Sequence, residues 1–140
     1  MNEVILKLGV NDVVYQDGTK LGDVAEWNEY GTETSPPRPA NRMGLEKAVK
    51  KNKKMVQGYL RNLTMAGLMK DKNMAKKLSR ERKIKLFTQI GRSARKETRD
   101  IIAAGSTAPN APATVAKKGF NHPLVETWIY HDNVNYEVQS

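Results

Sequence analysis

The chain has 140 residues, enough for one domain with an extended arm, and it has no cysteine, which excludes disulfides and thiolate metal sites. Apolar residues make up 39% and charged residues 28% of it, with a net charge of +9. A small core under much polar surface fits a subunit that completes its burial against neighbours. No apolar stretch approaches the roughly 20 residues of a membrane span, and no signal peptide is visible.

The positive charge is concentrated in the middle of the chain. Residues 46–85 carry fourteen Lys/Arg and three Asp/Glu, a net charge of +11, whereas residues 1–45 carry four and seven, a net charge of −3. Such asymmetry indicates an anionic partner, either nucleic acid or the acidic face of a protein, unless it marks only a solvated helix face. The side chains expected to contact that partner are Lys47, Lys50, Lys51, Lys53, Lys54, Lys76, Lys77, Arg80, Arg82 and Lys83.

Two short strands are predicted near the amino terminus. Residues 3–10 alternate in part, with apolar side chains at positions 4, 6 and 8, as in a half-buried strand. The pair Asp17-Gly18 is a tight-turn signal, and residues 13–15 before it read as a second short strand.

A short helix and a proline-rich loop follow. Residues 21–30 place Val24, Trp27 and Tyr30 at helical spacing, and Gly31 stands where a C-terminal cap belongs. Residues 31–41 then form an extended loop, because proline fixes its own φ and restricts the residue before it. We expect this loop to be an inter-subunit arm; the competing interpretation is a rigid lead-in to the next helix. The predicted interface residues are Trp27, Tyr30, Pro36, Pro37, Arg38, Pro39 and Trp128.

Two long helices are predicted within a basic segment, residues 43–104. The first starts soon after Pro39, and its apolar face carries Leu45, Val49, Val56, Leu60 and Leu63. Residues 65–74 are ambiguous, since Gly67 and Asn73 are both possible helix breakers. The second helix runs from about residue 79 to 104 and ends at the cap Gly105. Its inner stripe is Ile84, Phe87, Ile90, Gly91, Ala94, Thr98 and Ile101, and Gly91 in mid-helix predicts close packing.

The carboxyl-terminal part returns to strand. Residues 113–118 form a helical turn on this interpretation, and residues 134–138 alternate as a strand that pairs with the amino-terminal strands. The expected fold is therefore a single α+β domain, residues 1–140, in which a small antiparallel sheet packs with two long helices and an extended proline-rich loop.

No catalytic constellation is recognisable in the sequence. There is no cysteine nucleophile, phosphate-binding loop, nucleophile elbow or His-Glu-x-x-His motif, and the pair Glu26 and Glu29 is of a kind common on exposed helix faces. His122 and His131 lie outside any metal-ligand spacing and are treated as ordinary polar residues. We therefore expect no metal, no cofactor and no enzymatic activity.

Two ordered segments resemble the neck or tail-completion proteins of tailed bacteriophages, also described as minor tail or virion morphogenesis proteins. The first is the run Val24 to Gly31, followed after a polar loop by Pro36-Pro37-Arg38-Pro39. The second is the run Pro112 to Phe120, followed by His122-Pro123-Leu124-Val125-Glu126-Thr127 and a final short strand. The chain departs from the family at two positions: the family usually has an aromatic residue where this chain has Ala40, and a glycine where it has Trp128. The second departure affects the local turn, because Trp adopts a positive φ only at a cost.

The resemblance implies a structural virion protein that forms a ring in the head-to-tail connector, around the passage for DNA. Its implied partners are further copies of itself, a head-completion or adaptor protein on one side and a tail-terminator or tail-tube protein on the other, with DNA in the channel. Six copies match tail symmetry and twelve match portal symmetry; we favour six. The implied location is the virion, after assembly in the host cytoplasm. The alternative is a basic nucleic-acid-binding protein, although no DNA-reading motif is recognisable and few aromatics interleave with the lysines.

Overall fold

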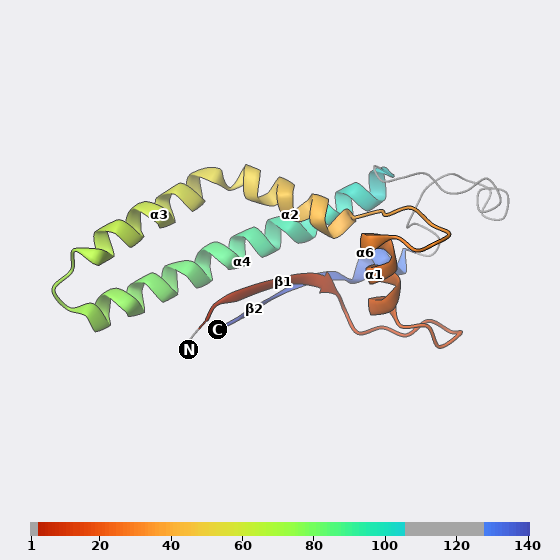
Figure 1. Cartoon of the computed structure of the whole chain (residues 1–140), viewed down its shortest axis with the longest axis horizontal. Coiled ribbons are helices and arrows are strands. Elements are labelled where there is room, and N and C mark those ends of the chain that lie inside the picture. Colours follow the sequence, from red (N-terminus) through yellow and green to blue (C-terminus); the bar gives the residue numbers. More distant parts are fainter. Residues whose placement is uncertain (1–2, 106–127) are drawn as a thin grey trace.

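The computed structural model describes residues 3–105 and 128–140, and its elements form an elongated body along which the chain doubles back (Figure 1). The predicted helical turn at residues 113–118 lies outside the described residues. The described elements, in chain order, are β1 (Ile5–Val10), α1 (Leu21–Tyr30), α2 (Ala40–Lys51), α3 (Lys53–Gly67), α4 (Lys72–Ala104), α6 (Ile129–Asn133) and β2 (Val134–Gln139). A two-stranded sheet with long helices confirms the predicted α+β class.

The sheet joins the two ends of the chain. Strands β1 and β2 are antiparallel, with Ile5 opposite Gln139 and Val10 opposite Val134. They run alongside α4, as Figure 1 shows, and the alternation of β1 turns its half-buried leucines toward that helix. The predicted pairing of the terminal strands is therefore confirmed.

The predicted second strand at residues 13–15 is wrong. Only Val14 pairs, in an isolated bridge to Lys20, around a turn in which Gly18 has a φ of 86°. The hairpin ends there because α1 begins at the next residue, Leu21, whose N–H donates to the Val13 carbonyl at 2.8 Å. The turn at Asp17-Gly18 and the helix at residues 21–30 are both confirmed.

The first long helix is divided at Asn52. The side-chain amide of Asn52 donates to the Ala48 carbonyl at 2.8 Å, and its backbone φ and ψ of −101° and 21° leave the helical range. Such local bonds from Asn compete with the helical ladder, which explains the break between α2 and α3. The start after Pro39 was predicted correctly, and of the two possible breakers in the ambiguous stretch, Gly67 is the one at which the helix ends.

The second long helix starts seven residues earlier than predicted. Asp71 caps α4, its carboxylate accepting from the Met74 N–H at 3.0 Å, so Asn73 lies inside the helix and breaks nothing. At the other end Gly105 adopts the left-handed conformation of a C-terminal cap, as predicted. The predicted close packing at Gly91 is confirmed, because a Cβ there would lie 2.8 Å from Cγ of the Tyr136 ring and closer still to its Cδ2.

Helix α2 packs on α4 through small residues rather than through its large apolar ones. Its buried side is formed by Ala40, Gly44 and Ala48, and a Cβ on Gly44 would lie 2.8 Å from the Thr98 backbone nitrogen. The predicted apolar face is therefore wrong in part: Leu45 and Val56 are half-buried, whereas Val49, Leu60 and Leu63 are exposed. Within α2, the close backbone approach to α4 leaves the larger Val49 outside the contact; Leu60 and Leu63 belong to α3.

Two hydrophobic clusters lie along α4. One joins α1, α2, α6 and β2 at the carboxyl-terminal end of α4, and it contains Leu21, Ala25, Ala40, Ile101, Ile102, Tyr130 and Val134. The other lies in the middle of α4 and contains Ala48, Leu86, Ile90 and Ala94.

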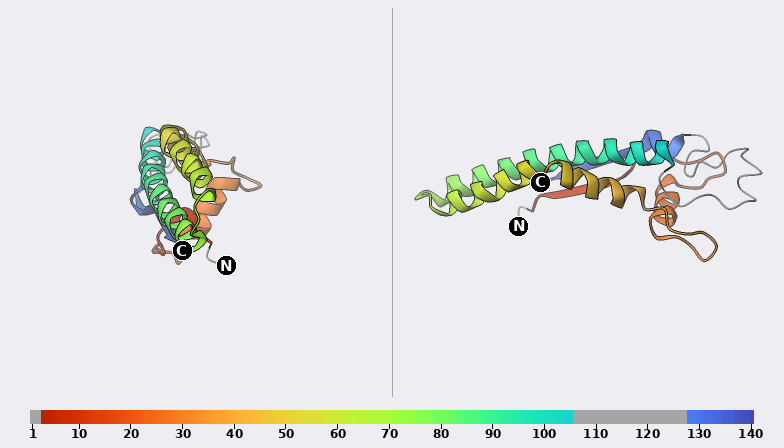
Figure 2. Two further views of the ribbon diagram at one scale, coloured as in Figure 1. Left: turned by 90° about the vertical axis from the view of Figure 1, so that its left-hand side faces the viewer. Right: turned by 90° about the horizontal axis from the view of Figure 1, so that it is seen from above.

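The views along and across the body show α3 and the first half of α4 projecting beyond the sheet as a helical hairpin (Figure 2). We call residues 53–85 the basic hairpin.

Candidate interaction surfaces

The basic hairpin concentrates most of the positive charge of the chain. It carries eleven Lys/Arg and two Asp/Glu, a net charge of +9. Its two helices pack against each other, yet α3 has no fully buried residue among its fifteen. Large apolar side chains are exposed along it and around its tip, namely Met55, Leu60, Leu63, Met65, Leu68 and Met74. These side chains are therefore candidates for contact with another molecule.

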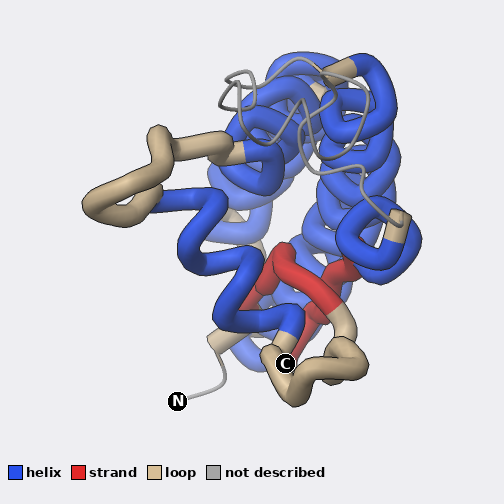
Figure 3. The backbone as a smooth tube through the Cα atoms, turned by 90° about the vertical axis from the view of Figure 1, so that its right-hand side faces the viewer, coloured by secondary structure: helices blue, strands red, loops and turns tan. Residues whose placement is uncertain are grey.

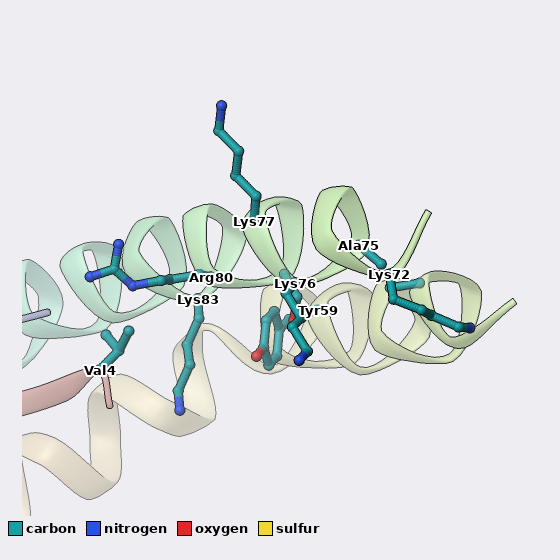
Figure 4. Close-up of a pocket in the computed structure, with 10 residues that line it drawn as sticks. Val4, Tyr59, Lys72, Ala75, Lys76, Lys77, Arg80 and Lys83 are labelled. Atoms are coloured by element: carbon teal, nitrogen blue, oxygen red, sulfur yellow. The ribbon is translucent and has the colours of Figure 1, made fainter. Parts of the chain in front are cut away.

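A groove of about 890 Å³ runs between the two helices of the hairpin. We call it the cationic groove. Its apolar and aromatic lining is Val4, Tyr59, Ala66 and Ala75, and its polar lining is Lys72, Lys76, Lys77, Ser79, Arg80 and Lys83. Figure 4 shows Lys76 and Lys83 on the side of α4 that faces α3, whereas Lys77 points away. The groove therefore combines an apolar floor with a basic rim.

The ten predicted anion-contacting residues do not form one surface. Lys76, Lys77, Arg80 and Lys83 line the groove, whereas the remaining ones lie elsewhere on α2, α3 and α4. Lys51 is already engaged, because its ammonium pairs with the carboxylate of Glu97, which is buried on α4. Lys83 lies 5.4 Å from the centre of the Phe87 ring, where a cation and an aromatic face attract each other.

The opposite end of the body is acidic and aromatic. Residues 11–37 carry one lysine and six Asp/Glu, a net charge of −5. Trp27 and Tyr30 are 51% and 79% exposed, so neither belongs to the core of the chain. Figure 3 looks at this end of the molecule and shows α1 with the loops on either side of it. Neither side chain is part of the two hydrophobic clusters among the described residues.

Glu29 ties this end to the start of α2. Its carboxylate accepts from the backbone N–H groups of Asn41 at 2.6 Å and Arg42 at 3.4 Å. These are donors that a helix start leaves without internal partners, and Pro39 at the cap position provides no side-chain acceptor. The sequence interpretation missed this role. A helix start without Ser, Thr, Asp or Asn was the available signal that an acceptor comes from elsewhere.

Burial raises the pKa of Glu29 above its ordinary value of 4.5, although the two backbone donors act in the opposite direction. The neighbouring Tyr130 hydroxyl accepts from the Asn41 side chain at 3.4 Å. Burial, and secondarily the charge of Glu29, raise the pKa of Tyr130 as well. The junction of α1, α2 and α6 is thus a fixed polar contact beneath the exposed aromatics.

The proline-rich loop leaves this junction and returns to it. Residues 32–37 are exposed, and the Thr32 N–H donates to the Ser35 carbonyl at 2.9 Å. The Arg38 N–H donates to the Asn28 carbonyl, which anchors the end of the loop on α1. Gly31, with a φ of 77°, caps α1 and lies against Pro37. Pro36 and Pro37 are thus exposed, and Arg38 and Pro39 are half-buried beside α2.

Trp128 has a left-handed backbone. Its φ is 62°, the one positive φ outside glycine among the described residues. The indole is 42% exposed and meets the His131 ring edge-on, with ring centres 5.0 Å apart. A bulky residue in this conformation costs roughly 1–2 kcal/mol. Trp128 therefore stands at a position that a glycine would occupy without strain.

Within residues 3–105 and 128–140, no group of three His, Asp or Glu side chains could hold a metal ion. No helix in the same ranges is both long enough and apolar enough to cross a membrane. The second segment of the family resemblance, through residue 127, lies outside the described residues. Comparisons with family models, with curated proteins and with solved structures returned no match.

Proposed function

We propose that this protein is a structural, non-enzymatic component of a tailed-phage virion, a ring subunit of the neck that joins the head-completion or adaptor ring to the tail. Six copies surround the DNA passage in this proposal, and the tail-terminator or tube protein lies on the far side. The observation that carries the proposal is the exposed apolar surface of the basic hairpin. Because α3 buries no residue fully in the single chain, its apolar side chains are left to be covered by another molecule.

The conformation of Trp128 supports the family resemblance. The family has a glycine at this position, and this chain has a left-handed backbone there despite its tryptophan. The Glu29 contact gives a second support, since Glu29 and Pro39, which belong to the two parts of the first resembling segment, fall on the two sides of one helix-start junction. In both cases the structure gives a physical reason for the residue type that the resemblance places at that position.

The observation that supports the alternative function, nucleic-acid binding, is the cationic groove. Lysine and arginine rims attract phosphates without sequence preference. However, the hairpin contains a single aromatic residue, Tyr59, and it is half-buried, so the hairpin has no row of stacking platforms for bases. The exposed apolar side chains also suit a protein partner better than a phosphate backbone. We therefore rank the neck function first.

The test is deletion of the gene from the phage genome that carries it. The expected result is filled heads and separate tails, or tails with a faulty end, while DNA replication and lysis proceed normally. Images of the purified neck should then show the protein as a closed ring in wild-type particles. Complete, infectious particles combined with a block in replication or lysis would overturn the proposal.

A further inference from the structure

The outward face of α1 has an unusual composition. Asp23, Glu26, Trp27 and Tyr30 follow the spacing i, i+3, i+4 and i+7, so they share one side of the helix. All four are exposed, whereas Leu21 and Ala25 on the other side are buried. This face thus presents two carboxylates and two large aromatic side chains. Faces with this spacing are the ones that amphipathic helices insert into grooves.

The cationic groove has the complementary composition. Its floor includes Tyr59, Ala66 and Ala75, and its rim includes Lys76 and Lys83. Aromatic side chains of a docked helix would cover the floor, and its carboxylates would meet the lysines. A helix of ten residues is about 15 Å long, which suits a groove bounded by two helices over a few turns.

The two surfaces cannot meet within one chain. Figures 1 and 2 show α1 and the tip of the basic hairpin at opposite ends of the elongated body, with the α2–α4 packing and the sheet between them. A contact between them must therefore join two copies, and it uses a different surface on each copy. Such a head-to-tail contact generates a ring when the rotation closes.

We propose that the α1 face of one copy docks in the cationic groove of the next, so that Trp27 and Tyr30 are the aromatic anchors and Asp23 and Glu26 pair with Lys76 and Lys83. The inference deepens the proposed function and rests on it, because it names the contact that would hold the ring together. It also offsets the self-repulsion of the basic hairpins, since each hairpin of net charge +9 receives an acidic segment of net charge −5.

The test exchanges the charges across the inferred contact. Asp23→Lys with Glu26→Lys reverses one side, and Lys76→Glu with Lys83→Glu reverses the other. Self-association of the purified full chain is measured by sedimentation over a concentration series at about 0.15 M salt. Each pair of substitutions should weaken association by at least about tenfold, and the chain that carries all four should regain most of it. Melting temperatures verify that every variant folds.

The matched control is Lys85→Glu with Arg92→Glu. Both residues are exposed on α4, and neither lines the groove. Their helical spacing from Lys76 places them on the opposite side of the helix. This variant changes the charge as much as the groove variant does, so it should associate like wild type within about twofold. A control that dissociates as strongly as the groove variant would show that total charge, not this contact, governs association.

Two further results would overturn the inferred contact. One is a chain with all four substitutions that self-associates as weakly as the variants with two substitutions. The other is a wild-type chain that remains monomeric up to its solubility limit. Neither result bears on the virion experiment, because a ring can be held by the rings above and below it. Conversely, the contact can pass this test while the protein is missing from the purified neck. That result would overturn the proposed function and leave the inferred contact standing.

Discussion

Glu29 shows how one side chain determines the path of the chain at the proline-rich loop. Its carboxylate, which comes from α1, accepts hydrogen bonds from the backbone N–H groups at the start of α2. Pro39, at the cap position, has no side-chain acceptor for them. We expect Glu29→Ala to lower the free energy of unfolding by about 1 kcal/mol, the usual effect of removing a helix cap. Urea denaturation measures this difference, and Glu26→Ala on the exposed side of α1 is the control. An equal loss in both variants would contradict the capping role.

The same carboxylate gives a pH dependence with a defined sign. Because burial raises the pKa of Glu29 in the folded chain, its protonated form is favoured by folding. The part of the stability that comes from this raised pKa is therefore fully present below the ordinary value of 4.5 and is lost as the pH rises through the folded pKa. Relative to Glu29→Gln, wild type should gain stability as the pH falls from 7 toward 4.5. A difference that stays constant, or changes in the opposite direction, would contradict the burial argument.

Trp128 allows backbone strain to be separated from side-chain contact. Trp128→Gly and Trp128→Ala both remove the indole and its contact with His131, but only alanine keeps a Cβ at a φ of 62°. The glycine variant should therefore be the more stable of the two, by about 1 kcal/mol. Thermal or chemical denaturation measures the order. If the two variants are equally stable, this residue has no left-handed backbone in solution.

At the scale of elements, the contact between α2 and α4 depends on a glycine. A Cβ on Gly44 would lie 2.8 Å from the Thr98 backbone nitrogen, which no rotation of a side chain can relieve. Gly44→Ala should destabilise the chain by about 1–3 kcal/mol, as overpacking does. Gly58→Ala is the matched control, since open space surrounds that glycine in α3, and it should stabilise by up to about 1 kcal/mol. Chemical denaturation compares the two variants, and a common sign would contradict the close packing.

The proline-rich loop can be tested as an arm because its two ends lie side by side. Gly31 lies against Pro37, so removal of residues 32–35 leaves a gap that a shortened loop can close. The deleted residues are exposed, so the melting temperature should change by less than about 2 °C, whereas ring closure or attachment to the adjoining ring should be lost. Arg38→Ala, which keeps the backbone bond to Asn28, should behave in the same way.

The contrary outcome distinguishes the two interpretations of the loop. If it serves only as the lead-in to α2, the deletion should lower the melting temperature and leave assembly intact in the folded protein. Calorimetry together with sedimentation or particle imaging measures both properties in one preparation. This test is independent of the groove experiment, because no residue is changed in both.

At the scale of the whole molecule, the uneven charge distribution separates the neck function from its alternative. Free protein with a net charge of +9 should bind duplex DNA, but only in the non-specific range, with a Kd of about 10⁻⁴–10⁻⁶ M at physiological salt. Lys76→Glu with Lys83→Glu and the control Lys85→Glu with Arg92→Glu should weaken this binding equally, because the attraction depends on total charge. Tight binding lost only in the groove variant, with a steep salt dependence, would favour the nucleic-acid function.

Local signals were sufficient for much of the fold. The alternation at residues 3–10 and 134–138, the helix at residues 21–30, and the caps Gly31 and Gly105 were all predicted, because each depends on neighbouring residues and on backbone conformations that glycine favours. The close packing of Gly91 was also predicted. By contrast, Asn52 and Asp71 were overlooked, although each acts within one turn of helix.

What the sequence by itself determined is the α+β class, the pairing of its terminal strands and the concentration of charge in one segment. Tertiary structure decided which faces are used. Gly44 lets α2 approach α4 so closely that small side chains form the contact, and Val49 of the same helix is left at the surface. The tertiary structure also places the acidic α1 and the basic hairpin at opposite ends of the body. This separation cannot be predicted from the periodicity of either segment. The reason is physical: hydrophobic spacing shows that a helix has an apolar side, but only the distance between backbones decides whether that side fits its neighbour or is left for another molecule.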